Sequence, residues 1–157
     1  MIANLEVNVD DSPILICYDD SDGAKRAIEV AAALLVDRKA VVLAVGPPLT
    51  VGESYASLGA MTPSFQELNE DEALARAETG AELARKAGFT AEARAGIAAP
   101  TWDGVVQVAD EIDAAAIVTG SRGFTGAKEL VEGSVSHAVA EHAGRPVLIV
   151  PPPRADT

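Results

Sequence analysis

Five short apolar runs, separated by segments with helical periodicity, constrain the fold more than any other feature of the chain. The runs occupy residues 14–18, 40–45, 91–97, 115–119 and 147–150. Between them, apolar residues recur at spacings of three and four, which predicts amphipathic helices. These helices are expected at residues 24–37, 66–86, 100–112 and 134–143. Strands that alternate with helices form right-handed crossovers, so the sequence predicts an α/β fold with a parallel sheet and helices on both faces.

The third run differs from the others because its alanines alternate with Glu92, Arg94 and Gly96. Such alternation is typical of a half-buried edge strand. We therefore expect a single-domain, doubly wound five-stranded sheet of order 3-2-1-4-5. In such a sheet, ligands bind where the strand order reverses, beside the carboxyl ends of strands one and four. Polar and glycine residues concentrate at those two ends, in residues 19–21 and 119–123.

Residues with strong backbone preferences mark the ends of the predicted elements. Ser21 or Asp22 is available to cap the first helix. Gly88 and Gly144 stand where helices end, and the prolines of residues 151–153 stop the last strand. The stretch 49–65 is rich in Gly, Ser, Thr and Pro without a period, which predicts a loop.

The composition fits one cytoplasmic domain. The chain of 157 residues is 48% hydrophobic but only 4% aromatic, so Ala, Val, Leu and Ile must build the core. We assign residues 1–157 to one domain with a core of about 12–152, a short polar N-terminal lead and a proline-rich C-terminal tail. Cys17 is the only cysteine, which excludes an internal disulfide, and its apolar neighbours predict a buried thiol. No apolar run spans a bilayer and the start lacks a basic, apolar leader, so we expect a cytoplasmic protein.

A formal net charge of −12 limits the partners. It should repel both duplex DNA and anionic membranes, so neither nucleic acid nor a membrane is an expected partner. A phosphate site must instead rely on local backbone N–H groups, basic side chains or a bound cation.

One motif meets this requirement: Gly120-Ser-Arg-Gly123, then nine residues, then Gly133-Ser134. Glycines let the backbone approach a ligand where a Cβ would collide. Gly133 and Ser134 open the last predicted helix, whose unpaired N–H groups and dipole favour an anion. The alternative interpretation is a loop that is glycine-rich only for turning.

With this motif the chain resembles the universal stress protein family, whose nucleotide-binding members carry Gly-x2-Gly-x9-Gly-Ser/Thr. Residues 118–123, 133–136 and 142–150 resemble the family's carboxyl-terminal pattern, and residues 14–21 resemble its first strand with a terminal aspartate. The resemblance covers about residues 12–152. It implies a module for the stress response that binds ATP, or ADP or AMP, dimerises through the last strand and hydrolyses ATP weakly or not at all.

The resemblance also implies a set of binding residues. Asp19 would contact the adenosine, the backbone of Val45 the adenine edge, and the glycine motif the ribose and phosphates. The full set is Asp19, Val45, Gly120, Ser121, Arg122, Gly123, Gly133, Ser134 and Val135. Asp20 departs from many relatives and adds negative charge, so we expect Mg²⁺ or Mn²⁺ to accompany the nucleotide, without a dedicated protein metal site.

Two functions from other classes are alternatives to nucleotide binding. A receiver domain needs a phosphoacceptor Asp after the third strand and a Lys after the last, and residues 96–100 and 150–153 offer neither. A dimeric interaction module that has lost nucleotide binding stays open. The sequence offers no clear catalytic residue: His142, Arg145 and Trp102 are expected to serve structural or surface roles.

Overall fold

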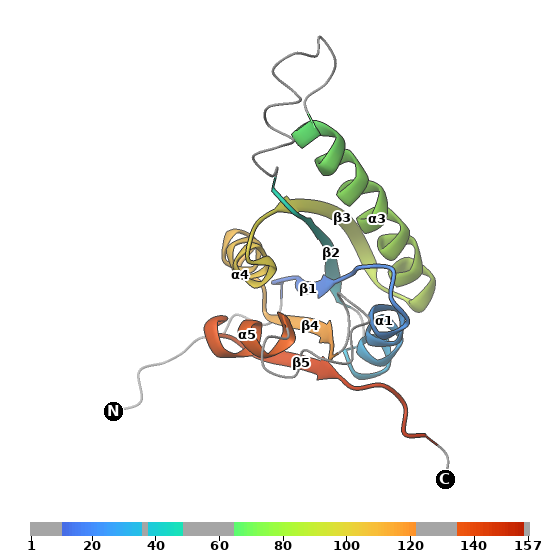
Figure 1. Cartoon of the computed structure of the whole chain (residues 1–157). Coiled ribbons are helices and arrows are strands. Elements are labelled where there is room, and N and C mark those ends of the chain that lie inside the picture. The colour runs from blue at the N-terminus through green and yellow to red at the C-terminus, as the bar shows by residue number, and fades with distance from the viewer. Residues whose placement is uncertain (1–10, 36–37, 49–64, 122–134, 156–157) are drawn as a thin grey trace.

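The computed structural model describes residues 11–35, 38–48, 65–121 and 135–155, and they form a parallel sheet between two helical layers (Figure 1). The strand order is β3-β2-β1-β4-β5, which confirms the predicted order. The strands are β1 (Ile14–Cys17), β2 (Lys39–Gly46), β3 (Thr90–Ile97), β4 (Ala116–Gly120) and β5 (Val147–Val150). β1 pairs with both β2 and β4 and therefore lies at the centre.

The described helices lie close to their predicted positions. They are α1 (Asp22–Leu34), α3 (Phe65–Ala87), α4 (Thr101–Glu111) and α5 (Val135–His142). Ser21 caps α1 by accepting a hydrogen bond from the N–H of Ala24, so this helix begins two residues earlier than predicted. It also ends earlier, because Leu35 leaves the helical conformation. Of the predicted 49–65 loop, Phe65 begins α3 and the other residues lie outside the described ranges.

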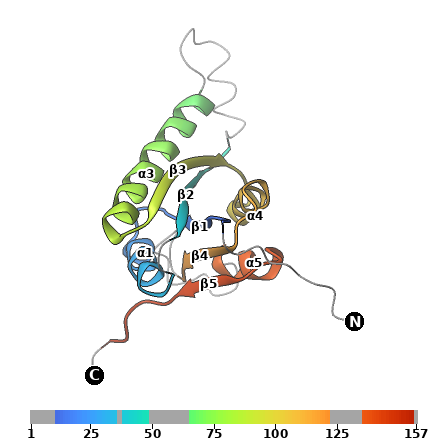
Figure 2. The same cartoon turned by 180° about the vertical axis from the view of Figure 1, so that it is seen from behind.

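Figures 1 and 2 show α1 and α3 on one face of the sheet and α4 and α5 on the other, and successive side chains of β1 and of Tyr18 just after it belong to different layers. Ile14, Ile16 and Tyr18 belong to the cluster that α1 and α3 cover. Leu15 and Cys17 belong to the cluster under α4 and α5. A strand buried on both faces reads as a continuous apolar run, which explains why periodicity alone located it. None of the described helices is long and apolar enough to cross a membrane.

The layer of α1 and α3 packs closely because its contact residues are small. Gly80 of α3 lies against the Tyr18 ring, and a Cβ there would come within 2.6 Å of the Tyr18 Cγ and 2.8 Å of the Val42 Cγ1. Apart from Gly80, the residues of α3 that are described as buried are all alanines: Ala73, Ala77, Ala81 and Ala84. Low aromatic content and many alanines thus let the helix axis approach the sheet.

The layer of α4 and α5 depends on a polar contact that the sequence did not reveal. Arg145 was expected to be a surface charge, but its side chain is only 16% exposed. It donates to the carbonyls of Ala109 and Ala114 at 2.9 and 2.7 Å and to the Asp110 carboxylate at 2.5 Å. Gly144, at φ 60°, turns the chain just before Arg145. The Ala109 carbonyl also accepts from the Ala114 N–H at 2.9 Å, so the guanidinium adds a second donor there and ties the last turn of α4 to the segment that follows it.

Candidate functional site

The carboxyl ends of β1 and β4 meet at the centre of the sheet, and the helices that follow them cover opposite faces (Figure 1). α1 follows β1 on one side, whereas α5 follows β4 on the other. This arrangement is the topological switch point at which ligands bind in doubly wound sheets. The fold therefore contains the switch point that the sequence predicts between strands one and four.

Asp19 is held in a fixed position just after β1. Its Oδ1 accepts hydrogen bonds from the Ser21 N–H at 3.0 Å and the Ser21 hydroxyl at 2.5 Å. Ser21 in turn accepts from the N–H of Ala24 at 3.1 Å. Within the described residues these bonds engage only Oδ1, so Oδ2 is available to a ligand hydroxyl or amine. The cap of α1 therefore also orients the carboxylate predicted to contact a ligand.

Asp20 points away from Asp19 and toward α3. Its φ of 66° is the left-handed conformation, which aspartate tolerates better than most residues. Its Oδ2 lies 3.9 Å from Nε of Arg76, which also faces Glu72 at 4.0 Å. Such exposed pairs contribute little stability. The positive charge of Arg76 nevertheless offsets part of the acidity that the sequence places beside the crevice.

Gly120 ends β4 against the first turn of α1. A Cβ on Gly120 would lie 2.9 Å from the backbone C and O of Gly23, so a side chain cannot be placed there without moving backbone. The next N–H, that of Ser121, donates to the Val150 carbonyl at 3.0 Å and extends the pairing with β5. Glycine is therefore required here so that β4 can pack against α1, while the role of Gly120 beside a ligand stays a prediction.

Val45 presents its backbone N–H and C=O groups toward the switch point, beyond the end of β1. The register pairs Cys17 with Leu43, so Val45 stands level with Asp19. The carbonyl of Leu43 accepts from the N–H of Tyr18, and groups on alternate residues point to the same side. The N–H and C=O of Val45 therefore face the space beyond the end of β1, and no backbone hydrogen bond joins them to the described part of β1. Its side chain is buried in the core.

The thiol of Cys17 lies under the site and is inert. Burial, then the negative charge of Asp19, raises its pKa from 9.0 to about 12, against a small lowering by Thr119. A thiol with such a high pKa holds almost no thiolate at neutral pH, so Cys17 is not a nucleophile. This agrees with the buried thiol predicted from the sequence.

The described part of the site offers no protein-held metal centre. No group of three or more His, Cys, Asp or Glu residues able to hold a metal occurs there. Asp19 and Asp20 are engaged by Ser21 and Arg76, respectively. A divalent cation here would depend on ligand phosphates for most of its coordination.

The structure thus brings Asp19, Val45, Gly120 and Ser121 to one edge of the sheet. Val135 is the first residue of α5 and packs beside the core under α4 and α5. The remaining predicted residues lie outside the described ranges: Arg122, Gly123, Gly133 and Ser134. Sequence reasoning missed Arg76, because nothing in its helical spacing indicates that α3 passes beside the turn after β1.

Comparison with known proteins identifies the family. The sequence model of the universal stress protein family matches residues 12–151. The chain belongs to this family. Universal stress protein YxiE of Bacillus subtilis is 32% identical over 144 residues, which cover 87% of this chain and 97% of YxiE.

Two solved universal stress proteins carry a ligand. One is in complex with cAMP; its TM-score is 0.63 at 25% identity, over 88% of this chain and 96% of that chain. The other, from Archaeoglobus fulgidus, is in complex with dAMP; its TM-score is 0.60 at 27% identity, over 88% and 97%. This universal stress protein therefore has relatives with the same fold that bind adenine nucleotides.

Proposed function

We propose that this universal stress protein binds an adenine nucleotide, with ATP as the expected ligand, and acts as a nucleotide-dependent module of the stress response. The observation that carries the proposal is the outward-facing backbone of Val45 beside the fixed carboxylate of Asp19, at the switch point of the sheet. A backbone N–H next to a C=O matches the ring nitrogen and amino group on the adenine edge. The complexes of relatives with cAMP and dAMP support the same ligand class.

Each site residue receives a role in this proposal. Val45 pairs with the adenine edge, and the Oδ2 of Asp19 accepts a hydrogen bond from the adenosine. Gly120 and Ser121 bring the end of β4 close to the sugar. The phosphates are assigned to the remainder of the glycine motif and the start of α5, as the sequence predicts. Mg²⁺ or Mn²⁺ would bridge the phosphates and offset the net charge of −12.

Calorimetric titration with ATP, with and without Mg²⁺, tests the proposal. We expect micromolar affinity that the metal strengthens. Asp19→Asn should weaken binding about tenfold, the equivalent of roughly 1.4 kcal/mol, because it removes the charge from the acceptor. Asp22→Asn is the matched control: Asp22 is an exposed acid in the first turn of the same helix, and its loss should change affinity less than twofold.

A second variant tests the phosphate cradle. Gly133→Val should abolish binding, because a branched side chain would occupy the space in which phosphate meets backbone N–H groups. Ser134→Ala keeps those N–H groups and should weaken binding less. If Ser134→Ala is the more harmful change, side chains hold the phosphates and the cradle mechanism is wrong.

The second candidate function is a dimeric interaction module without nucleotide binding. One observation favours dimerisation: β5 ends the sheet, and its Ile149 is 37% exposed. Pairing β5 with its copy across a two-fold axis would cover this edge. Light scattering should report a dimer at tens of micromolar. A dimer that gives neither heat nor a thermal shift with millimolar ATP and Mg²⁺ would establish the second function and overturn the first.

We assign binding rather than catalysis. His142 stacks against Trp102, with ring centroids 4.2 Å apart, and its Nδ1 lies 2.9 Å from the Ala138 carbonyl. These contacts give it a structural role in the layer of α4 and α5. A phosphate-release assay with the purified protein should show turnover far below that of a dedicated ATPase.

A further inference from the structure

The opposite edge of the sheet is formed by β3, and part of its backbone makes no hydrogen bond to the residues that the structure describes. The N–H of Ala98 donates to the Gly46 carbonyl, so the groups of the even-numbered residues at this end of β3 point toward β2. Groups on alternate residues point to opposite sides of a strand. The N–H and C=O groups of Ala93, Ala95 and Ile97 therefore point outward, away from the sheet.

The two ends of the β3 edge differ in whether their outward carbonyls accept a hydrogen bond. Near the start of β3, the Ala91 carbonyl accepts a hydrogen bond from Nε of Arg85 at 3.0 Å, and Arg85 pairs with Glu78. This contact covers one outward carbonyl. No such contact with the described residues covers the carbonyls of Ala93 and Ala95.

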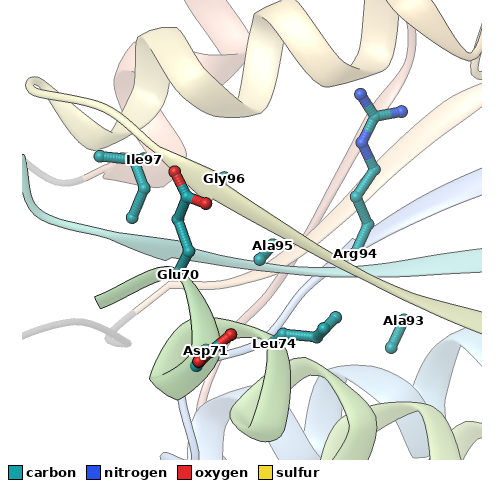
Figure 3. A pocket seen from close by; sticks show the side chains of 8 residues that line it. All are labelled: Glu70, Asp71, Leu74, Ala93, Arg94, Ala95, Gly96 and Ile97. Atoms are coloured by element: carbon teal, nitrogen blue, oxygen red, sulfur yellow. The ribbon is translucent and has the colours of Figure 1, made fainter. Parts of the chain in front are cut away.

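A cleft of about 660 Å³ opens along the uncovered half, between β3 and the first part of α3 (Figure 3). Its lining residues are Glu70, Asp71, Leu74, Ala93, Arg94, Ala95, Gly96 and Ile97. Leu74 is 46% exposed and contributes an apolar surface to the lining of the cleft. The small side chains of Ala93 and Ala95 leave room above the strand edge.

The charged residues of the cleft favour a cationic occupant. Glu70 and Asp71 project from α3, and Figure 3 shows Glu70 reaching toward β3 near Gly96. Arg94 extends to the other side of the strand and pairs with Glu111 of α4. The first half of α3, residues 65–75, holds four acidic residues and no basic one.

We propose that the β3 edge is a docking site for an extended, lysine- or arginine-rich segment of a partner protein, which adds a sixth strand to the sheet. Backbone hydrogen bonds to Ala93, Ala95 and Ile97 would hold the segment, as in other cases of strand addition. Its basic side chains would face Glu70 and Asp71. A second copy of this chain is the less suitable occupant, because each copy carries −12 and the acidic starts of two α3 helices would be brought together.

Amide hydrogen exchange and peptide titration test the proposal. The probe is the capped peptide Lys-Val-Lys-Val-Arg-Val-Lys, and its matched control replaces each basic residue with Glu. The basic peptide should bind and slow exchange at Ala93, Ala95 and Ile97 at least tenfold, and its affinity should fall with salt. The acidic peptide should not bind.

Two variants locate the site. Glu70→Lys should weaken the basic peptide at least fivefold, whereas Glu82→Lys, an exposed acid of α3 outside the cleft, should not. Ala95→Pro removes an outward donor without breaking the pairing with β2, so it should abolish peptide binding in a folded protein. If Ala95→Pro fails to fold, the comparison of Glu70→Lys with Glu82→Lys still tests whether the peptide binds in the cleft.

Three results would overturn the proposal. One is equal binding of the two peptides, or no binding of the basic peptide at millimolar concentration. Another is slow exchange at Ala93 and Ala95 in the free monomer, which would mean that the chain covers its own edge. The third is self-association that Ala95→Pro abolishes, which would make a second copy the occupant. None of these results depends on whether the protein binds a nucleotide.

Discussion

The two helical layers pack against the same sheet with different kinds of contact. In the layer of α1 and α3, alanines and Gly80 bring helix and sheet close together around Tyr18. In the layer of α4 and α5, the core contains larger side chains. The end of α4 is held there by hydrogen bonds from Arg145. Steric fit therefore limits the first layer, and hydrogen bonding supports the second. This difference predicts which substitutions each layer tolerates.

The largest effect is expected for Gly80→Val. The new side chain would collide with the Tyr18 ring and Val42, neither of which is a flexible chain end. We expect a loss of about 3 kcal/mol of unfolding free energy, or failure to fold, because overpacked cores must move backbone. Ala75→Val, on the exposed side of the same helix, is the control and should cost less than about 1 kcal/mol. Chemical denaturation measures both, and equal losses would contradict close packing in this layer.

Arg145→Met tests the polar support of the second layer. Methionine keeps much of the side-chain volume but removes the guanidinium bonds to the Ala109 and Ala114 carbonyls and the pairing with Asp110, leaving Ala109 only the Ala114 N–H. We expect a loss of about 2 kcal/mol. Arg26→Met removes a single exposed hydrogen bond to the Pro151 carbonyl and should cost less than about 0.5 kcal/mol. If the two variants unfold at the same denaturant concentration, Arg145 does not support the end of α4.

Alkaline pH probes both layers through two adjacent residues, Cys17 at the end of β1 and Tyr18 directly after it. Burial raises the pKa of Cys17 to about 12, and burial, followed by the Asp20 and Asp19 carboxylates, raises that of Tyr18. The neutral form is favoured in the folded state, so ionisation of the unfolded chain lowers stability as pH rises above each ordinary value. From pH 9 to 10, Cys17 should contribute a loss of about 1 kcal/mol.

Single variants separate the two contributions. Cys17→Ala should flatten the decline of stability above pH 9, and Tyr18→Phe should flatten it above pH 10. The Tyr18 hydroxyl makes no hydrogen bond of normal geometry with the described residues, although the Asp20 carboxylate lies near enough to raise its pKa, so Tyr18→Phe should cost less than about 1 kcal/mol at pH 7. Denaturation curves between pH 7 and 11 measure both effects. Parallel curves for parent and Cys17→Ala would show that the thiol is not responsible.

The smallest effect is expected for His142→Ala. Loss of the stacked ring should cost about 1 kcal/mol or less. Because Trp102 is the only tryptophan, its emission should shift to longer wavelength as water gains access. Glu141→Ala, an exposed neighbour on the same helix, should leave the emission unchanged. An unchanged spectrum in His142→Ala would mean that the stacking does not persist in solution.

The predicted fold is accurate because each element is encoded by its own local pattern. Continuous apolar runs located the buried strands, and the alternation around Arg94 correctly placed β3 at an edge. Gly88 and Gly144 have positive φ values, as their positions at helix ends suggested. Contacts between distant segments were not predictable in the same way. The pairing of Asp20 with Arg76 depends on how α3 crosses the sheet, and no local pattern records that.

The candidate site follows the same rule as the fold: features encoded by a local pattern were predictable, and contacts between distant segments were not. The register places Asp19 and Val45 level at the carboxyl edge and packing against Gly23 explains Gly120, whereas the binding roles of these residues stay predictions. The sequence treated Asp19 as a ligand contact only, whereas the structure shows that it also supports the cap of α1. Arg145 was wrongly placed at the surface because a lone arginine between a helix and a strand gives no local sign of burial. The roles of Gly133 and Ser134 stay predictions.

The burial of Cys17 has a practical consequence for protein chemistry. Since the only thiol of the chain is shielded between the sheet and the layer of α4 and α5, the native protein should behave toward thiol reagents as if it had no cysteine. A cysteine introduced at an exposed position would then be the single point of attachment. A spin label or fluorophore could be placed beside either edge of the sheet without first removing a core residue.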